Sequence, residues 1–503
     1  MNEQSRSGLL DRLPSAWTLL ISTFAGLAGV AGSFAVAAFT PSFVAGPIAG
    51  LMAREMPAVV VRYAITVLGD LGDQLNILAA LALSTALFAG AALIGLAVAQ
   101  RAEIPRFGPP VAAAVATVAA FAVTRAPLAS VAAGAAVGAV LGVAELATLP
   151  DIETVSGDRR RVLGGVASGV GLAGVGYFLG NRGGFSEPTG ASEPLQVTSS
   201  VRAEIQQRLN EAEGRSLGVD GLESLVSEEF YEVDINATDP TIAAEDWELS
   251  VTGAVDEELT YSYEEIRGMD VESRFVSLRC VGESLNGEKM DNALWTGVPI
   301  TNVVDPAGPA EECCVMLRAD DGYYEEFPLP ALEGGFLAFG MNGDTLPEGH
   351  GYPVRALIPG HWGEINVKWI TEIEVLEEEI DGYWEERGWH GTGPVNTVAK
   401  IHHEERLDDG RMRVGGHAYA GTRGVSSVEV STDGGDSWTE AELSADLPGE
   451  DVWRQWVHTY DPPGGEHEVV ARAIEADGTV QPSEETDAFP SGPSGWVSRT
   501  VSS

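Results

Sequence analysis

The sequence predicts a multi-domain protein in which an α-helical transmembrane bundle is followed by a mixed α+β domain and then by a β-sandwich. Three observations predict this order. Long runs of Ala, Val, Leu and Gly dominate up to about residue 180. Short strand-like runs between Gly and Pro turns begin near Glu228, and short strands at sandwich spacing begin near Val395. The predicted domains are 1–182 (transmembrane), 183–222 (linker), 223–394 (mixed) and 395–503 (sandwich).

The first domain contains stretches long enough to cross a membrane. A spanning helix needs about 20 apolar residues. Five stretches meet this criterion, at roughly 16–38, 75–99, 108–124, 127–148 and 162–180. Between the first two, the segment from Pro41 to Gly72 has Pro, Arg and Asp residues among shorter apolar runs, and we expect interfacial or re-entrant helices there. The sequence therefore predicts a multi-pass protein of the cell membrane.

Arginines near the ends of these stretches predict the orientation. The basic clusters are Arg6 with Arg12, Arg101 with Arg106, and Arg159 with Arg160 and Arg161. In a bundle with five spans all of them fall on one side, which the positive-inside rule makes cytoplasmic. The later domains are then extracytoplasmic, whereas an error of one span would invert this result.

The last basic cluster has a second interpretation. The run from Arg159 to Leu163 reads R-R-R-V-L and is close to a twin-arginine export signal, which carries folded proteins across a membrane. The alternative is that the three arginines only obey the positive-inside rule. A cofactor that is inserted in the cytoplasm favours export.

Composition excludes one class of partner and suggests an environment. The formal net charge is −44, and the only lysines are Lys289, Lys368 and Lys400. Nucleic acid is not an expected partner, because binding to phosphates needs clustered Lys and Arg. Dispersed carboxylates with few lysines indicate the surface of a halophilic protein, the alternative being a generally acidic extracellular protein.

Cysteine and histidine usage limits the possible metal sites. Of the three cysteines, Cys313 and Cys314 are neighbours and are not expected to bridge to each other. All eight histidines lie between His350 and His467, so the bundle has no imidazole for a b-type haem. No haem is expected. The bundle is then an anchor, or a docking surface for a quinone or another subunit.

Two groups of motifs carry the chemistry of the mixed domain. In the first, the strand-like run from Phe275 ends at Cys280 and is followed by W-T-G-V-P-I from Trp295 to Ile300. In the second, N-G-D-T-L-P from Asn342 is followed by H-G-Y-P-V-R, I-P-G and V-K-W-I, the last ending at Ile370. Taken alone, a cysteine after a strand is most often a small buried hydrophobe, and a lone basic residue is most often a surface ion pair.

Together these motifs resemble the sulfite oxidase family of molybdopterin-dependent oxidoreductases, with matching spacing throughout. The resemblance implies a sulfite oxidase-type α+β domain with a molybdenum-molybdopterin cofactor, in which the Cys280 thiolate is the molybdenum ligand and catalytic residue. The cofactor-binding residues implied by the resemblance are Phe230, Tyr231, Asp234, Cys280, Asp320, His350, Arg355, Asn366, Val367 and Lys368. Asp321 remains an alternative to Asp320. Cationic donors suit the phosphate of the pterin.

The substrate pocket departs from the family pattern. Glu232 stands where sulfite oxidases have an arginine, Glu283 to Leu285 where further arginines follow the metal cysteine, and Trp389 where they have a tyrosine. A carboxylate in place of a basic group would repel sulfite. We therefore expect Glu232 and Trp389 to line a pocket for a neutral or cationic small molecule, or for an S-oxide or N-oxide that is reduced.

The C-terminal domain has turn signals between short strands. The segment from Val428 to Trp438, with a turn at Asp433 to Gly435, predicts a hairpin and resembles the immunoglobulin-like dimerisation domain of the same family. A homodimer is implied by that resemblance. His402 and His403 are not expected to bind a metal together, because neighbours on a strand point to opposite faces, and we expect both to be surface residues.

Three functions remain open at this level. The first is a membrane-anchored enzyme that transfers an oxygen atom to or from a small substrate and exchanges electrons with a separate carrier or a quinone-linked subunit. The second is a catalytically decayed scaffold that retains the fold, which the joint presence of Cys280, His350, Arg355 and Lys368 opposes. The third is a transporter or channel, which the lack of paired charges within the spans opposes.

Overall fold

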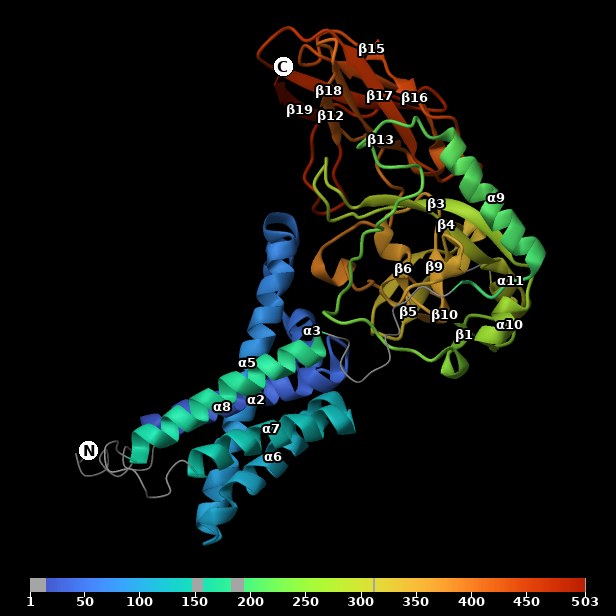
Figure 1. Ribbon diagram of the computed structural model, residues 1–503. Helices are drawn as coiled ribbons and strands as arrows, with labels where there is room; N and C mark the ends of the chain where they lie inside the picture. Colours follow the sequence, from blue (N-terminus) through green and yellow to red (C-terminus); the bar gives the residue numbers. More distant parts are fainter. Residues whose placement is uncertain (1–14, 147–156, 182–193, 311–312, 503) are drawn as a thin grey trace, which may run out of the picture. The chain divides into compact units, whose positions relative to one another are not determined.

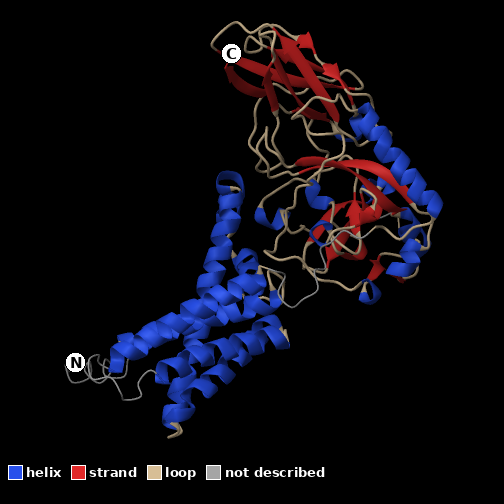
Figure 2. Cartoon of the chain, in the orientation of Figure 1, coloured by secondary structure: helices blue, strands red, loops and turns tan. Residues whose placement is uncertain are grey.

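The computed structural model describes residues 15–146, 157–181, 194–310 and 313–502. The chain forms two compact units, of which the first comprises Met1–Pro57, Asp70–Thr189 and Asp234–Thr241 and the second Ala58–Gly69, Gly190–Val233 and Ile242–Ser503. The first unit is helical, and the strands belong to the second (Figures 1 and 2). The chain therefore leaves the first unit after Pro57 and returns to it at Asp70.

The helices of the first unit follow the apolar stretches of the sequence. They are α2 (Ala16–Ala37), α3 (Ala45–Glu55), α5 (Asp70–Arg101), α6 (Gly108–Thr124), α7 (Pro127–Leu146) and α8 (Gly157–Gly180). Among the described residues, five helices are long and apolar enough to cross a membrane: Ala16–Ala37, Leu71–Arg101, Pro105–Thr124, Pro127–Leu146 and Val162–Leu179. The five predicted stretches thus form five helices. Arg6, Arg12 and the side chains of Arg159, Arg160 and Arg161, on which the orientation was predicted, lie outside the described part of the chain.

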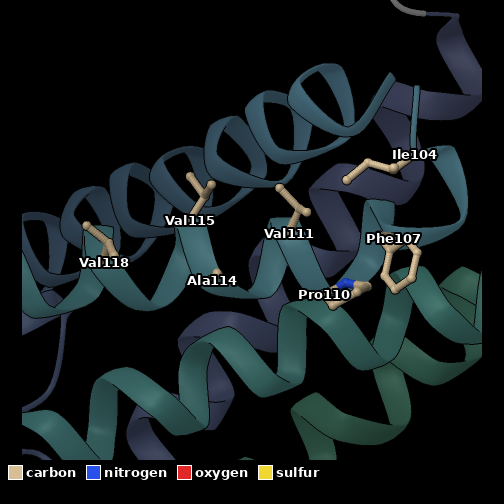
Figure 3. A pocket seen from close by; sticks show the side chains of 7 residues that line it. All are labelled: Ile104, Phe107, Pro110, Val111, Ala114, Val115 and Val118. Atoms are coloured by element: carbon tan, nitrogen blue, oxygen red, sulfur yellow. The ribbon is translucent and has the colours of Figure 1, made fainter. Parts of the chain in front are cut away.

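Small residues bring these helices together. A Cβ added to Gly26 in α2 would meet the carbonyl oxygen of Thr85 in α5, and one added to Gly134 in α7 would meet the carbonyl oxygen of Ala113 in α6. Close backbone approach through glycine is the usual packing of helices in a membrane, where dispersion forces replace the hydrophobic effect. The outer surface is apolar as well, and Figure 3 shows a groove along α6 lined by the side chains of Ile104, Phe107, Pro110, Val111, Ala114, Val115 and Val118.

Two sheets form the first part of the second unit. The first has the strand order β2-β1-β10-β5-β6, with β1 and β10 parallel and the other neighbours antiparallel. Its strands are β1 (Glu248–Gly253), β2 (Leu259–Ser262), β5 (Cys314–Ala319), β6 (Tyr324–Pro328) and β10 (Ile370–Leu376). The second sheet is antiparallel, with the order β3-β4-β7-β8 and β9 paired to β7. Its strands are β3 (Glu272–Arg279), β4 (Met290–Pro299), β7 (Phe336–Met341), β8 (Asp344–Thr345) and β9 (Arg355–Leu357).

Short helices complete this part of the unit. They are α4 (Ala58–Tyr63), the π-helical turn η1 (Ala64–Leu68), α9 (Ser199–Arg215), α10 (Tyr263–Arg267) and α11 (Thr301–Val304). Helix α9 lies within the predicted linker, and its N-cap is the hydroxyl of Thr198, which accepts from the Val201 amide. The Pro41–Gly72 segment, for which interfacial or re-entrant helices are predicted, is shared between the units, since Ala58–Gly69 belongs to the second unit.

The C-terminal residues form two antiparallel sheets, as the turn spacing predicts. Their orders are β11-β13-β17-β16, with β12 beside β13, and β15-β14-β18-β19. The strands are β11 (Val398–Ala399), β12 (His403–Arg406), β13 (Met412–Tyr419), β14 (Val425–Ser431), β15 (Thr439–Glu440), β16 (Glu442–Leu443), β17 (Arg454–Tyr460), β18 (Glu466–Glu475) and β19 (Val497–Ser502). The turn at Asp433 closes the predicted hairpin between β14 and β15, and Gly434 and Gly435 have positive φ there.

Strand β3 is tied to these C-terminal sheets. The Ser277 amide donates to the Asp451 carbonyl at 2.9 Å, and the Ser277 hydroxyl oxygen accepts from the Trp453 amide at 2.9 Å. The Tyr419 hydroxyl donates to the Ser277 carbonyl at 3.1 Å. Because β4 pairs with one edge of β3 and these hydrogen bonds hold the other edge, the strand presents its end, and the residue that follows it, in a fixed position.

Two predictions about single residues are wrong. Cys313 and Cys314 form a disulfide. Cys313 precedes β5 and Cys314 begins it, so the alternation of strand side chains that normally separates neighbours does not apply to this pair. His402 is exposed as expected, but His403 is only 7% exposed, because the same alternation turns it into the sandwich.

Candidate functional site

Cys280 lies at the end of a buried strand. Strand β3 ends at Arg279, and the Cys280 amide donates to the Lys289 carbonyl at 3.0 Å, just before β4 begins. The thiol is free of disulfide bonds. A Cβ added to Gly282 would stand 3.9 Å from Cys280 Sγ and 3.7 Å from the Trp389 ring, so glycine leaves room beside the sulfur. The loop between β3 and β4 therefore presents a sulfur atom next to an aromatic wall.

The surroundings of Cys280 disfavour a free thiolate. Burial raises the pKa of the Cys280 thiol to about 11, and the Glu283 carboxylate adds to the rise. The thiol is therefore neutral at pH 7 in the absence of a cation. A bound metal would replace the proton and neutralise the sulfur, which is how a buried cysteine becomes a stable ligand.

Glu283 does not line an open pocket, contrary to the expectation from its sequence position. Its carboxylate accepts from Arg279 Nε at 2.8 Å and from Lys400 Nζ at 2.7 Å, and Arg279 and Lys400 are fully buried. The Arg279 guanidinium also donates to the Asn396 carbonyl at 2.8 Å. Because two cations neutralise Glu283, this carboxylate supports the Cys280 loop and does not repel a substrate.

The second group of motifs folds into one cluster of basic residues. The 3-10 turn η6 (Glu348–His350) is followed by Gly351 with a φ of 108°, a conformation that favours glycine. A Cβ on Gly351 would be 3.0 Å from the Cβ atoms of Arg355 and Lys368. Arg355 donates to the carbonyls of His350 and Asn366, and Lys368 donates to that of Gly349. His350, Arg355 and Lys368, which come from separate parts of the motif, thus lie around the turn at Gly351.

This cluster is electropositive, as its effect on His350 shows. Burial lowers the pKa of His350 to about 3, and the charges of Arg355 and Lys368 lower it further. His350 is therefore neutral, in contrast to the cationic donor that the sequence suggests, and its 3.6 Å contact with Glu232 is not an ion pair. A partly buried pair of cations around a glycine turn fits an anionic group such as the phosphate of a pterin.

The backbones of Asn366 and Val367 contact residues of this cluster and of the neighbouring strand β9. The Asn366 carbonyl accepts from Arg355 at 3.0 Å, and the Val367 carbonyl accepts from the Ala356 amide at 2.8 Å. The Asn366 side chain faces inward, because its Oδ1 accepts from the Ile358 amide and its Nδ2 donates to the Trp362 carbonyl. Asn366 thus fixes the loop on which Lys368 stands.

The segment Phe230–Glu232 lies between the sulfur and the basic cluster. The Phe230 ring packs edge-on against His350, with centroids 5.5 Å apart. Glu232 approaches His350 from the exposed side, where its side chain is 53% exposed. The Tyr231 pKa is raised by burial first and then by Cys280, which places the phenol near the sulfur. One extended segment therefore connects both parts of the site.

Trp389 is buried beside Cys280, as the sequence predicts for a pocket residue. It is 2% exposed and packs edge-on against Phe489 and Trp384, at centroid distances of 5.2 Å and 6.2 Å. An aromatic ring held from two sides is a rigid apolar wall.

The predicted aspartates differ in their placement. Asp320 lies in the turn between β5 and β6, where its amide donates to the Trp369 carbonyl at 3.0 Å, next to Lys368. The Asp321 carboxylate is engaged within that turn, accepting from the Tyr323 amide at 2.9 Å. Asp234 is grouped with the helical unit and not with the cluster around Cys280.

A buried carboxyl group near Cys280 was missed by sequence reasoning. Glu364, in the 3-10 turn η7 (Gly363–Ile365), is 9% exposed, and its carboxylate lies against Gly391. Burial, followed by repulsion from Glu385, raises the Glu364 pKa to about 8. In a chain with carboxylates spread over its whole surface, no local pattern distinguishes a buried glutamate from an exposed one.

A single cysteine thiolate cannot fill the coordination sphere of a metal. Across residues 15–146, 157–181, 194–310 and 313–502, no group of three or more His, Cys, Asp and Glu side chains could hold a metal ion. A metal at Cys280 would need its remaining ligands from a non-protein group, as a molybdenum-pterin dithiolene provides.

Two family models match the strand-rich part of the chain. A family model described as "Oxidoreductase molybdopterin binding domain" matches residues 236–384, and one described as "Mo-co oxidoreductase dimerisation domain" matches residues 393–489. Mitochondrial sulfite oxidase of Macaca fascicularis is 27% identical over 301 residues, covering 48% of this chain and 54% of that protein. The chain thus spans about half the length of the curated sulfite oxidases it matches.

Two further matches are a Bacillus subtilis protein and a solved structure from Paracoccus pantotrophus. The uncharacterized oxidoreductase YuiH of Bacillus subtilis is 31% identical over 150 residues, covering 29% of this chain and 74% of that protein. Among solved structures, the sulfane dehydrogenase SoxCD from Paracoccus pantotrophus superposes with a TM-score of 0.47 at 18% identity, covering 57% of this chain and 86% of that chain.

Proposed function

The chain belongs to the molybdopterin oxidoreductases of the sulfite oxidase family, and from this membership we propose that it transfers an oxygen atom to or from a small substrate other than sulfite. The matched domain makes the protein an oxidoreductase with molybdenum-molybdopterin as its cofactor. The observation that carries the substrate proposal is the Glu232 carboxylate, 3.6 Å from His350, where the family resemblance implies an arginine.

The residues of the site fit the cofactor. Cys280 would supply the thiolate ligand, and Arg355 and Lys368 would hold the phosphate, with the neutral His350 donating or accepting a hydrogen bond beside them. Phe230 and Tyr231 would close one side of the pterin. When bound, the molybdenum centre supplies two-electron exchange of an oxygen atom with the substrate.

The charge near the site opposes an anionic substrate. Glu232 is half-exposed and its carboxylate stands on the open side of the cluster, where it repels an oxyanion. Trp389 offers an apolar surface beside Cys280. A neutral or cationic molecule, or the reduction of an S-oxide or N-oxide, fits these walls. Reduction of an S-oxide takes up two electrons and two protons and releases water, so a separate carrier or quinone-linked subunit has to supply the electrons.

The remaining proposals concern location and assembly. Five candidate spans support a multi-pass anchor in the cell membrane. The twin-arginine-like run supports an extracytoplasmic catalytic domain, and the net charge of −44 supports a halophilic environment without nucleic-acid partners.

The match to the dimerisation domain supports a homodimer built on an immunoglobulin-like sandwich. The chain itself is proposed to carry no haem, because the described bundle has no histidine.

The cofactor proposal is tested by metal and pterin analysis of the full-length protein. We expect about one molybdenum and one pterin per chain in the wild type, and loss of redox activity with depleted molybdenum in Cys280→Ser. A Cys313→Ser/Cys314→Ser double variant is the matched control, since it changes cysteines on β5 and should keep the metal. Well-folded wild-type protein without molybdenum or pterin would overturn the proposal in favour of a scaffold.

The substrate proposal is tested by comparing wild type with Glu232→Arg and Glu232→Gln. Steady-state rates with sulfite, dimethyl sulfoxide and trimethylamine N-oxide are measured with an artificial electron donor or acceptor. We expect the wild type to turn over a neutral oxide but not sulfite, and Glu232→Arg to gain affinity for sulfite by roughly tenfold or more. Wild-type kcat/KM for sulfite that exceeds that for every neutral oxide would contradict the proposal.

A further inference from the structure

A short apolar segment from the N-terminal part of the sequence packs beside Cys280. The segment Ala58–Gly69 follows Pro57 and forms α4 and the π-helical turn η1 before Gly69, whose φ is 52°. Although it stands between α3 and α5 in the sequence, it belongs to the second compact unit. Single π-helical turns occur frequently at functional sites, because they redirect side chains at some cost in hydrogen-bond geometry.

Ile65, in the π-helical turn, reaches the glycine next to the metal ligand. A Cβ added to Gly282 would stand 2.9 Å from Ile65 Cγ2, 3.7 Å from Trp389 Cη2 and 3.9 Å from Cys280 Sγ. Three side chains from distant parts of the chain thus converge on one point. Ile65 is partly buried there and packs against the hydrophobic core of the second unit. The absence of a side chain at Gly282 leaves the space that Ile65 faces.

A second contact holds the same segment. The Arg62 guanidinium lies over the Phe489 ring, 4.8 Å from its centroid, and Phe489 packs edge-on against Trp389. Cation–π contacts of this kind contribute about 0.5–1 kcal/mol at exposed sites. Arg62 therefore contacts Phe489, which packs against Trp389, and Ile65 lies near Trp389 at Gly282.

The other face of the segment is free of these contacts. Val59, Tyr63 and Val67 are 66%, 53% and 61% exposed. Val67 lies two residues after Ile65 in the same turn, so a substitution there changes the same element without changing the face that meets Gly282. Val67 is therefore a matched control for Ile65.

We propose that the segment Ala58–Leu68 is a wall of the substrate pocket and that Ile65 determines which substrates reach the centre at Cys280. This inference rests on the proposed function for its chemistry. With Ile65 and Trp389 both beside Gly282, next to the Cys280 sulfur, the pocket takes a small neutral molecule with an alkyl group beside the transferred oxygen, such as a dialkyl sulfoxide. A bulky or charged group at that position meets the isoleucine or the indole.

Proximity of Ile65 to Cys280 is tested without the cofactor. Full-length Ile65→Cys and Val67→Cys proteins, each carrying Cys313→Ser and Cys314→Ser, are produced in a host that makes no molybdopterin and are treated with a short bis-thiol-reactive linker. We expect mass spectrometry of the digests to find the bridge to Cys280 from position 65 and at least tenfold less from position 67. Equal bridging from both positions, or none from position 65 while Cys280 reacts singly, would overturn the proposal.

The effect on substrate choice is tested with the loaded enzyme. Ile65→Ala, Ile65→Trp and Val67→Trp are compared on dimethyl sulfoxide, a longer dialkyl sulfoxide and methyl phenyl sulfoxide, with molybdenum content measured in each. A methylene in an apolar pocket typically changes kcat/KM by roughly tenfold or more. We expect Ile65→Ala to favour the larger sulfoxides by that factor and Ile65→Trp to raise KM for all of them, with Val67→Trp unchanged.

The two proposals fail in different ways. Identical substrate profiles for Ile65→Ala, Ile65→Trp and wild type, with normal molybdenum content, would remove the role of Ile65 and leave the oxidoreductase intact. A wild type that contains no molybdenum would remove the proposed function and with it the pocket. If the loaded wild type reduces none of the sulfoxides, the substrate class is wrong, and the cross-link alone decides whether the segment forms the wall.

Discussion

Individual charged residues determine the electrostatics around Cys280. Glu283 is paired with the cations Arg279 and Lys400. Burial and then the neighbouring Glu385 carboxylate raise the pKa of Glu364 to about 8. Two glutamates thus have different environments, because one is paired with cations and the other is buried next to a second carboxylate. The sequence shows only that both positions are acidic.

Glu364 should make stability depend on pH. Its pKa is raised from 4.5 to about 8 in the folded protein, so the folded state binds the proton more tightly than the unfolded chain. The resulting stabilisation is complete below pH 4.5 and is lost as pH rises to about 8. Relative to Glu364→Gln, we expect the wild type to lose on the order of a few kcal/mol between pH 5 and 8.5.

This expectation is checked by the melting temperature of both proteins across that pH range. The difference between wild type and Glu364→Gln is the quantity of interest, because Glu223 and Asp451, with pKa values raised to about 7 by burial, titrate in the same range in both proteins. A difference in melting temperature that does not change with pH would contradict the assignment.

Lys400 should be required for the Cys280 loop. Its ammonium is fully buried and donates to Glu283 and to the Gly287 carbonyl, both at 2.7 Å. Lys400→Met leaves Glu283 buried with one cation in place of two, and removal of one partner of a buried pair typically costs about 3–5 kcal/mol. Chemical denaturation is the measurement, with Arg411→Met as the control, since the Arg411–Asp409 pair is exposed and its loss should leave the midpoint unchanged.

At the scale of elements, turns bring the functional side chains together. The end of β3 positions Cys280, and the turn after η6 positions His350, Arg355 and Lys368 around Gly351. The strands supply rigid ends and the glycines supply close approach. The motif places Gly351 at the position where the turn needs a positive φ.

The substitution Gly351→Ala should push apart Arg355 and Lys368, the two cations of the cluster of basic residues. The added Cβ would stand 3.0 Å from the Cβ atoms of Arg355 and Lys368 and would occupy a residue with a φ of 108°. We expect the pterin content of the purified protein to fall by roughly tenfold. Gly322→Ala is the matched control, because its φ is 86° but no atom lies within 4 Å of the added Cβ. Equal pterin content in both variants would show that Gly351 does not shape the site.

At the scale of the whole molecule, two compact units share segments of the chain. The helical unit takes Asp234–Thr241, and the strand-rich unit takes Ala58–Gly69. Within the helical unit, Arg54 of α3 donates to Asn236 at 2.8 Å. Domain boundaries drawn along the sequence assign these two short segments to the wrong unit, because composition does not show which distant segments pack together.

The charge of the whole chain should make its stability depend on salt. With a net charge of −44, repulsion between carboxylates opposes the compact state, and added salt screens it. We expect the melting temperature of the full-length protein to rise by at least several degrees, roughly 5–10 °C, between 0.1 and 2 M KCl. Sucrose at matched osmolality is the control for general solute exclusion, and an equal rise in sucrose would contradict the electrostatic origin.

Much of this protein could be predicted from the local pattern of its sequence. Apolar stretches predicted the five long helices, and short strand-like runs between Gly and Pro turns predicted the strands of the second half. The spaced motifs predicted that Cys280, Arg355 and Lys368 belong to one site, and the structure places Arg355 and Lys368 together at Gly351. These features depend on neighbours in sequence or on short fixed spacings, which the chain carries explicitly.

Only the tertiary structure decided which charges are neutralised and which distant segments meet. Two contacts join residues that are far apart in the chain, namely the pairing of Glu283 with Lys400 and the approach of Ile65 to Gly282. The raised pKa of Glu364 follows from its burial in the folded protein. Burial and long-range packing control these properties, and a single sequence shows neither. The motifs of the sequence by themselves indicated the family of oxidoreductases, and the fold decided which charges and side chains surround Cys280.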